Sequence, residues 1–477
     1  MPQSLDHLRS EADRLLAARD VDAAIAAHRA LLERDPADHT GWFNLGWLLG
    51  QTGQLNEGLE AYDSAIKAGA SGEHEIRTAR AALLTRAHRE EEALEELERA
   101  LSLTPSHGPA LLNAGNIRED RGEREKARAL YERALRADPR SALAFARLLA
   151  VTDFENVDAP LLQQAWAALR SGQLADGDAA DIGFAAGAAF DRLGAYEAAW
   201  ESYTRANAAA HRMHAAAGRS FDAAQVRAFT DRSIAAFTQA PAGRQGEEAP
   251  IFILGLFRSG STLLEQILSA HPQVDAGGEL EIIPRLSKDI GPLSSEAVGT
   301  ARSDYLAQAR TLGLGEGLFT DKQPDNFRHV GLIKTLFPSA RILHTVREPV
   351  DNLLSLYFLH LGGDRAYAAD LESLAIWHRE HVRLMSHWKS LYGEDIIDVS
   401  YDNLVAEPEP VIRDVLSRVG LPFDEACLAP HRNRNSVRTA SVWQVREAIH
   451  TRSSGRARNY ERWLGPLREA LAASQNP

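Results

Sequence analysis

The sequence predicts a multidomain chain, with an all-α solenoid of helical repeats in its N-terminal half and an α/β domain with a parallel sheet in its C-terminal half. Three observations support this prediction. The chain has 477 residues, too many for one compact hydrophobic core. Up to about residue 215 it is rich in Ala, Leu, Arg and Glu, shows no convincing strand and repeats at a fixed spacing. After about residue 249, short apolar runs alternate with helical segments, as in a parallel sheet covered by helices.

The composition, 44% hydrophobic and 25% charged, is that of an ordinary globular protein. A net charge of -13 argues against a general nucleic-acid binder, which needs a basic surface. The single cysteine, Cys427, excludes a disulfide within the chain. The N-terminal residues lack the apolar centre of a signal peptide, and no run approaches the roughly 18 apolar residues of a membrane span. We therefore expect a cytoplasmic enzyme without a membrane span.

Repetition in the N-terminal half has a period near 34 residues. Pro139 follows Pro105 by 34 positions, and Gly115 follows Gly46 by 69, close to two periods. Small residues let two helices approach, and a proline ends the second helix of each unit. Tyrosines recur late in the second helix, at Tyr62, Tyr131 and Tyr203. This pattern resembles tetratricopeptide repeats. A non-repetitive helical bundle is the alternative, and the shared register of several positions argues against it.

The changes in composition near residues 215 and 249 divide the chain into three segments. We predict tetratricopeptide-like repeats over residues 1–215, whose clearest copies contain NLGWLLGQTGQLNEGLEAYDSAIKAG and NAGNIREDRGEREKARALYERALRADP. A more diverged copy is GAAFDRLGAYEAAWESYTRANA. A helix and a polar linker follow over 216–248, and the α/β domain covers 249–477.

The first apolar run of the α/β domain, residues 250–254, leads into the loop GLFRSGST at 255–262 and then a helix. Further strands are expected at 340–346 and 395–400. A strand, a glycine-containing loop and a helix N-terminus together favour anion binding. The spacing is close to that of a nucleoside-triphosphate loop, but Ser261 stands where such a loop has lysine, and Arg258 supplies the cation earlier.

The segment ILGLFRSGSTLLEQILSAHPQV resembles the 5'-phosphosulfate loop of sulfotransferases. The resemblance covers roughly residues 250–468 and is to tyrosylprotein sulfotransferases and to bacterial proteins that join tetratricopeptide repeats to a sulfotransferase. It implies a P-loop-type sulfotransferase domain that uses 3'-phosphoadenylyl sulfate as donor and releases adenosine 3',5'-bisphosphate. The residues that would hold the 5'-phosphosulfate are Arg258, Ser259, Gly260, Ser261 and Thr262. The cation and hydroxyls suit such a group.

Other segments extend the resemblance. Arg347 ends a predicted strand and Ser355 follows it by eight positions, the spacing with which the family grips the donor's 3'-phosphate. The tyrosylprotein enzymes have an arginine four residues further on, where this chain has Leu359. By similarity, Tyr401 would contact the nucleotide and Arg456 would replace a family lysine on the donor.

The segment from Arg432 to Arg462 is arginine-rich and resembles the loop that folds over the nucleotide in the family. Within it, Ser441 would touch the phosphosulfate bridge. A solvated basic helix is the alternative for the outlying arginines.

The segment VDAGGELEIIPRL resembles the one that carries the family's catalytic base, and Glu279 falls on that base. Lys322 matches the lysine that stabilises the leaving bridging oxygen. Glu281 stands where the tyrosylprotein enzymes carry an arginine that contacts their acidic peptide. We expect no metal ion. His378, Glu380 and His381 match no zinc motif, and we interpret them as an exposed helix face.

These observations predict transfer of a sulfuryl group to an acceptor hydroxyl. A protein or peptide tyrosine is the first candidate, because repeat arrays usually present a concave face to peptides or protein partners. A small hydroxylated metabolite or a glycan stays open. Two other classes also stay open, namely a kinase on the same fold and a non-catalytic repeat scaffold. The acceptor, the oligomeric state and the partner of the repeats do not follow from the sequence.

Overall fold

The chain divides into two compact units after Val151. The computed structural model describes residues 4–18, 20–69, 71–240, 249–287, 294–315, 317–362, 365–432 and 447–472.

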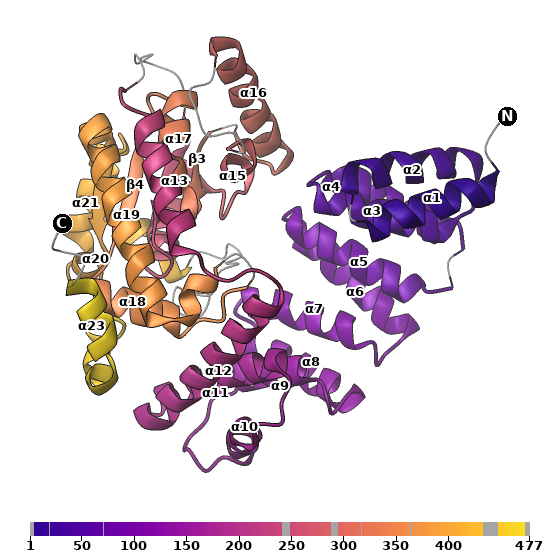
Figure 1. Cartoon of the computed structure of the whole chain (residues 1–477), viewed down its shortest axis with the longest axis horizontal. Coiled ribbons are helices and arrows are strands. Elements are labelled where there is room, and N and C mark those ends of the chain that lie inside the picture. Colours follow the sequence, from indigo (N-terminus) through magenta and orange to yellow (C-terminus); the bar gives the residue numbers. More distant parts are fainter. Residues whose placement is uncertain are drawn as a thin grey trace. The chain divides into compact units, whose positions relative to one another are not determined.

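Consecutive helical hairpins make up the first unit (Figure 1). Its helices are α1 (Leu5–Ala17), α2 (Val21–Arg34), α3 (His39–Gln51), α4 (Leu55–Lys67), α5 (Glu73–Arg86), α6 (Glu90–Leu103), α7 (Gly108–Asp120), α8 (Arg124–Ala137) and α9 (Ala142–Val151). Short polar turns separate them. At two of these turns Asp20 and Asp38 cap the next helix by accepting a bond from a backbone N–H, which satisfies an amide that has no partner within the helix.

The prediction that small residues let the two helices of a unit approach is confirmed in the first unit, where the small residues meet the recurring tyrosines. A Cβ on Gly46 would lie 2.9 Å from the Tyr62 ring, and one on Gly115 would lie 2.3 Å from the Tyr131 ring. Both contacts join the first and second helices of a hairpin, α3 to α4 and α7 to α8. Only glycine leaves room for the ring at this crossing, so the register deduced from the sequence reflects one repeated packing contact.

The second unit opens with the helices α10 (Pro160–Ser171), α11 (Asp176–Arg192), α12 (Tyr196–Ala216) and α13 (Ala223–Ala236). Gly187 on α11 meets Tyr203 on α12, where a Cβ would lie 2.8 Å from the ring. This hairpin therefore repeats the contact of the first unit, as its diverged sequence predicts. It nevertheless belongs to the compact unit that contains the sheet. The contacts thus divide the chain at a different place from the change of composition near residue 215.

A parallel sheet of five strands forms the centre of the second unit, with strand order β2-β3-β1-β4-β5. The strands are β1 (Ile251–Gly255), β2 (Val274–Ala276), β3 (Leu318–Lys322), β4 (Ile342–Val346) and β5 (Ile396–Ser400). Every residue of β1 is buried, as expected for a central parallel strand covered on both faces. The α/β class predicted from the sequence is confirmed.

Helices connect the strands and cover the sheet (Figure 1). They are α14 (Ser261–Ser269), α15 (Ile282–Leu286), α16 (Ser295–Thr311), α17 (Val330–Leu336), α18 (Pro349–Tyr357), α19 (Leu371–Tyr392), α20 (Tyr401–Ala406), α21 (Pro408–Arg418) and α23 (Gly465–Ala472). The 3-10 segment η6 (Arg456–Trp463) precedes α23. One hydrophobic core joins β1, α14, β4, β5 and α21.

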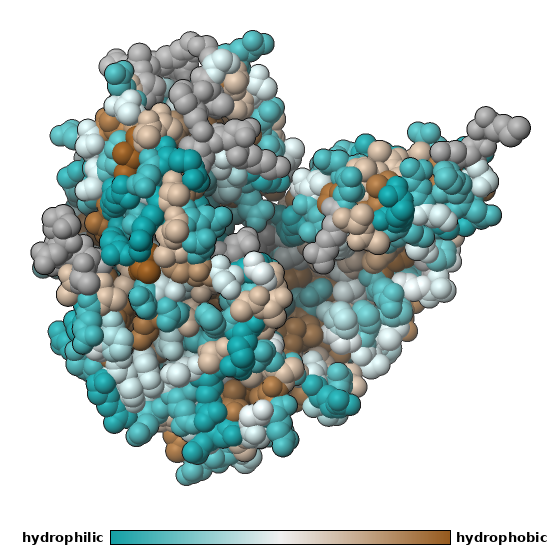
Figure 2. All heavy atoms as spheres, viewed as in Figure 1, coloured by the Kyte–Doolittle hydropathy of each residue, from teal (hydrophilic) through white to brown (hydrophobic). Residues whose placement is uncertain are grey.

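Hydrophilic side chains cover most of the face of each unit that Figure 2 shows. The large apolar residues that are exposed, such as Trp47 and Val382, are scattered along the chain. Within the part of the chain that the structure describes, no helix has the length and apolar character needed to cross a membrane.

Candidate active site

The loop between β1 and α14 adopts the conformation of an anion-binding turn. Arg258 has a φ of 67° and Gly260 has a φ of 102°, both in the left-handed region that side chains other than glycine rarely adopt. A Cβ on Gly260 would also lie 2.5 Å from the Tyr401 ring, so this position admits only glycine. A turn of this kind before a helix can direct the first amides of the helix towards an anion.

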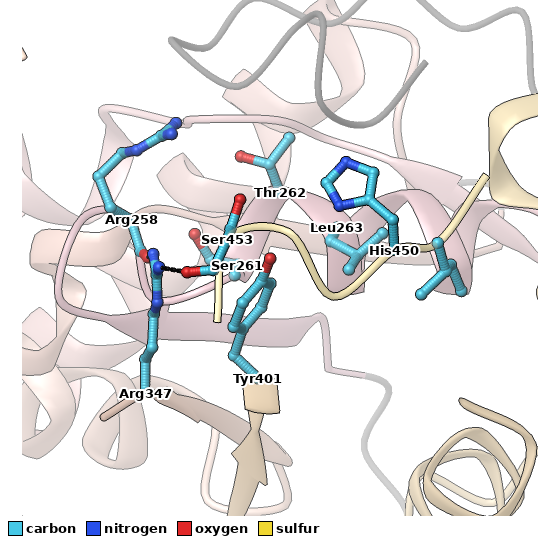
Figure 3. Close-up of a pocket in the computed structure, with 10 residues that line it drawn as sticks. Arg258, Ser261, Thr262, Leu263, Arg347, Tyr401, His450 and Ser453 are labelled. Atoms are coloured by element: carbon cyan, nitrogen blue, oxygen red, sulfur yellow. Dashed lines mark hydrogen bonds between the residues drawn. The ribbon is translucent and has the colours of Figure 1, made fainter. Parts of the chain in front are cut away.

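A pocket lies over this loop. Figure 3 shows its walls, which come from the loop, from the end of β4, from the start of α20 and from residues near the C-terminus. The described lining residues are Arg258, Gly260, Ser261, Thr262, Leu263, Arg347, Tyr401, Ile449, His450 and Ser453. None of them is acidic. Two guanidinium groups without a carboxylate on the lining favour a ligand with several negative charges.

Arg347 holds the pocket together at the end of β4. Its Nη1 donates to the backbone oxygen of Arg258 at 3.0 Å, and its Nη2 donates to the backbone oxygen of Ser453. The guanidinium also lies over the Tyr401 ring, 4.9 Å from the centroid. Burial lowers the pKa of Arg347, which is the direction expected for a cation removed from water. An anion in the pocket would compensate for that lost hydration.

Arg258 contacts Ser355 on α18, which the sequence also predicts to bind an anion. Its Nε donates to Ser355 Oγ at 3.1 Å, so the structure brings together two side chains 97 positions apart. Burial, and then the charges of Arg347 and Arg456, lower the pKa of Arg258 to about 10. Three arginines therefore influence one another here, as expected of a site prepared for a polyanion.

Ser259, in contrast, is bonded within the protein. Its hydroxyl donates to Leu256 O at 2.6 Å and lies 2.6 Å from Thr345 Oγ1, and its amide donates to Leu256 O. The side chain is 1% exposed. Ser259 thus fixes the loop against β4, while Ser261 and Thr262 line the pocket.

Glu279 and Lys322 form an ion pair at the same edge of the sheet. Lys322 Nζ lies 2.6 Å from Glu279 Oε1, the lysine is fully buried and the glutamate side chain is 32% exposed. Lys322 ends β3, and Glu279 follows β2, the next strand. The carboxyl ends of parallel strands meet at one edge, where ligand sites of α/β folds lie. A lysine here could equally have been a solvated surface residue, and its complete burial beside Glu279 argues against that alternative.

Glu265, which sequence reasoning did not single out, supports the loop that carries Glu279. It lies on α14 and its Oε1 accepts from the Gly278 amide at 3.0 Å and from Thr320 Oγ1 at 2.9 Å. Burial raises the pKa of Glu265, while the Lys322 charge acts in the opposite direction. Glu265 therefore connects the helix of the anion loop to the backbone next to Glu279. The sequence shows an acidic residue in the second turn of that helix, but it does not show in which direction the side chain points.

Arg456 is absent from the described pocket lining. Its Nη2 lies 2.6 Å from Asp191 Oδ2 on α11, and its guanidinium lies 4.9 Å from the centroid of the Phe358 ring. The predicted residue Ser441 lies outside the described residues. His450 and Ser453 line the pocket although they were not predicted. Both belong to the arginine-rich segment, whose composition gave no reason to choose them.

The expectation of an exposed face at His378, Glu380 and His381 is wrong for two of these residues. Glu380 and His381 are each 5% exposed, and His381 Nε2 lies 3.1 Å from His344 Nε2 on β4. The long helix α19 packs on the sheet through this face. Among the described residues, no group of three or more His, Cys, Asp or Glu side chains is placed to hold a metal ion.

Comparison with known proteins agrees with this arrangement. A model of the sulfotransferase family matches residues 250–425, and a model of the tetratricopeptide repeat matches residues 9–73 and 77–145. An uncharacterised protein of Aquifex aeolicus is 28% identical over 407 residues, which are 80% of this chain and 52% of that protein. Protein-tyrosine sulfotransferase A of Caenorhabditis elegans is 26% identical over 198 residues, 37% of this chain and 51% of that protein.

The chain spans about half the length of the curated relatives it matches. Among solved structures, the sulfotransferase domain of the olefin synthase of Synechococcus PCC 7002 aligns over 46% of this chain and 90% of that domain, with 25% identity and a TM-score of 0.36. The family models fall on the two parts that the sequence and the fold distinguish. The chain therefore carries tetratricopeptide repeats followed by a domain of the sulfotransferase family.

Proposed function

We propose that the protein is a sulfotransferase that moves the sulfuryl group of 3'-phosphoadenylyl sulfate to an acceptor hydroxyl. The observation that carries this proposal is a cationic pocket with no acidic residue among its described lining residues, at the same sheet edge as the Glu279–Lys322 pair. A donor with a phosphosulfate and a 3'-phosphate carries charge at two places. Arg258 with the start of α14 suits one of these groups, and Arg347 with Ser355 suits the other.

In the proposed reaction, Glu279 accepts the proton of the acceptor hydroxyl. The acceptor oxygen forms its bond to sulfur while the bond from sulfur to the bridging phosphate oxygen breaks, and that oxygen keeps the electron pair. Lys322 donates a hydrogen bond to the departing oxygen. An ammonium group has three donors, and Glu279 uses one of them in this structure. Positioning and electrostatic stabilisation supply most of the rate in such transfers.

The acceptor is proposed to be a tyrosine of a peptide or protein. Two findings support it, namely the protein-tyrosine sulfotransferases among the relatives and the repeat hairpins, which commonly bind peptides. Glu281 stands where the tyrosylprotein enzymes have an arginine that contacts their acidic peptide, so a small hydroxylated metabolite or a glycan is the alternative acceptor.

Calorimetric titration of the full chain with adenosine 3',5'-bisphosphate, without magnesium, tests the donor. Binding followed by transfer of radiolabelled sulfate to a tyrosine peptide would support the proposal. Binding of ATP with magnesium but not of the bisphosphate would favour a kinase. Binding of the bisphosphate without transfer to any acceptor panel would favour a scaffold that has kept a nucleotide site.

A further inference from the structure

The second half of the chain's arginine-rich segment, with the residue that follows it, forms a strap across the donor pocket. We define the strap as residues 447–463, which includes η6. Its first part supplies the lining residues Ile449, His450 and Ser453, as Figure 3 shows for the latter two. Because a segment without a strand or long helix has little internal stability, its position depends on the contacts that hold it.

Two acidic residues of the sulfotransferase domain hold the middle of the strap. Asp351 on α18 accepts from the Gly455 amide and from the Ala457 amide, the latter at 2.6 Å. Asp402 on α20 accepts from Ser454 Oγ at 2.5 Å. These contacts fix the backbone immediately after the pocket-lining residue Ser453.

The third attachment comes from the helical hairpin α11–α12. Asp191 Oδ2 lies 2.6 Å from Arg456 Nη2, and its other oxygen accepts from Tyr460 OH. The Asp191 side chain is 16% exposed and the Arg456 side chain 22%, so the pair is largely removed from water. Burial tends to lower the pKa of Arg456, but Asp191, Tyr203 and Tyr460 leave it raised. The pair is therefore held by more than a surface attraction.

Asp191 occupies a position that local helix energetics disfavour. It lies in the last turn of α11, which ends at Arg192, and a negative charge at a helix C-terminus opposes the helix dipole. A local conflict of this kind needs a tertiary compensation. The strap provides it through Arg456 and Tyr460, and ring contacts reinforce it, with Trp200 stacked on Trp463 at 5.3 Å.

We propose that Asp191 is a positioning residue for the donor site, which holds Arg456 and Tyr460 and thereby keeps His450 and Ser453 of the strap over the pocket. The inference rests on the proposed function, since it concerns the binding of the same donor. Under this proposal, the hairpin α11–α12, which packs like a repeat, contributes to donor binding.

Calorimetric titration with adenosine 3',5'-bisphosphate tests the inference on the full chain. In Asp191→Asn we expect the dissociation constant to rise about tenfold, and the donor KM to rise similarly while kcat at saturating donor stays within about threefold of wild type. The matched control is Asp176→Asn, which breaks an exposed pair with Arg212 in the same hairpin and should leave the dissociation constant within about twofold.

A double-mutant cycle separates positioning from a general loss of structure. If Asp191 acts through Arg456, Asp191→Asn in an Arg456→Met background adds less than about twofold to the dissociation constant. A multiplicative effect of the two changes would overturn the inference, as would an Asp191→Asn variant that binds like wild type.

Tyr460→Phe is a second test of the inference, to be used if the Asp191→Asn variant does not fold. It removes only the hydroxyl that Asp191 accepts from, and we expect a rise of about threefold in the dissociation constant with an unchanged melting temperature. An unchanged dissociation constant in that variant would contradict the inference. Failure of the wild type to bind the bisphosphate would contradict the proposed function itself. That outcome differs from failure of the inference because the control Asp176→Asn would then not bind either.

Discussion

Glu279 and Lys322 show how burial sets the properties of an ion pair. The lysine has lost all contact with water, and the glutamate retains some. A buried ammonium needs a counter-charge, and Glu279 supplies it at 2.6 Å. The exposed part of the carboxylate is the part that an acceptor hydroxyl could reach.

Replacing Glu279 by Gln should slow transfer without weakening donor binding. The amide keeps a hydrogen-bond acceptor for Lys322 but does not take a proton, so kcat should fall roughly 10²- to 10⁴-fold, the range for loss of a general base. Steady-state sulfate transfer and bisphosphate titration measure the two quantities. Glu60→Gln, an exposed glutamate on α4 of the first unit, is the control. A variant with near wild-type kcat would contradict the assignment.

Replacing Arg347 by Ala should weaken donor binding strongly. The side chain is a pocket-lining cation that also bonds the loop and the strap, and hydrogen bonds to charged groups contribute about 1.5–3 kcal/mol. We expect the dissociation constant of adenosine 3',5'-bisphosphate to rise roughly 10- to 100-fold by calorimetry. Arg341→Ala, at the other end of β4 and paired with Asp395, should bind as wild type does. Equal effects of the two changes would argue against a donor contact.

At the scale of elements, β3 presents different chemistry on its two faces. Lys322 faces the site, whereas the neighbouring Asp321 is fully buried and accepts from Tyr305 OH at 2.8 Å. Burial raises the pKa of Asp321 to about 8. The folded state therefore retains this proton at pH values where the unfolded chain, with an ordinary aspartate pKa near 4, has lost it.

Because the folded pKa of Asp321 is raised, its contribution to stability is fully present at low pH and is lost as the pH rises towards about 8. We expect the free energy of unfolding of wild type minus that of Asp321→Asn to fall from pH 5 to pH 8 and then to level off. The Oδ1 of the new asparagine can still accept from Tyr305 OH. The Oδ1 of Asn326 has no partner in the structure, and after rotation of that amide it can accept from the Nδ2 of the new side chain. Urea unfolding across this range measures the difference, and a flat profile would contradict the prediction.

The helix crossing in α7–α8 gives a second prediction at this scale. Gly115→Ala would place a methyl group 2.3 Å from the Tyr131 ring. That ring is fully buried, and its hydroxyl is held by Glu119. Overpacking of this kind costs about 1–3 kcal/mol. Hydrogen exchange should show this destabilisation as a loss of protection of the α7 and α8 amides. Gly108→Ala, where nothing lies within 4 Å of the added Cβ, should show no loss, and similar protection in both variants would contradict the packing argument.

At the scale of the whole molecule, the second compact unit includes a hairpin with the packing of a repeat. Tyr203 on α12 stacks on Phe358 with the ring centroids 3.9 Å apart, and Asn207 Nδ2 donates to Tyr357 O at 2.8 Å. These are buried contacts with α18 and the residue after it. Removing the hairpin would expose the aromatic rings and leave the Tyr357 carbonyl without this donor.

Two truncated chains test which part of the chain the proposed donor site needs. We expect residues 152–477 to fold and to bind adenosine 3',5'-bisphosphate within about threefold of the full chain. A chain that begins at residue 216, where the composition changes, should unfold at lower temperature or aggregate, because it lacks α11 and α12. Thermal unfolding and titration distinguish the two, and equal behaviour would show that the hairpin is dispensable.

The sequence by itself determined the features that repeat or that follow one another along the chain. The regular recurrence of glycine, proline and tyrosine predicted the repeats, because one packing contact recurs at a fixed period. Apolar runs predicted the strands β1, β4 and β5, and the order of strand, glycine loop and helix pointed to the loop before α14 as the candidate anion site. The short β2 and the partly polar β3 offered no such run. Resemblance to a family supplied Glu279 and Lys322, which the structure brings into contact.

Only the tertiary structure decided which side chains face the pocket and which face the interior. Ser259 is bonded to β4, and Arg456 pairs with a residue 265 positions earlier in the chain. His450 and Ser453 reach the pocket from a segment whose arginine-rich composition did not single them out. Such contacts join parts of the chain that are far apart in sequence, so local pattern and spacing carry no record of them. The direction of a side chain depends on the packing of the whole unit, and that packing placed Asp191 beside the strap.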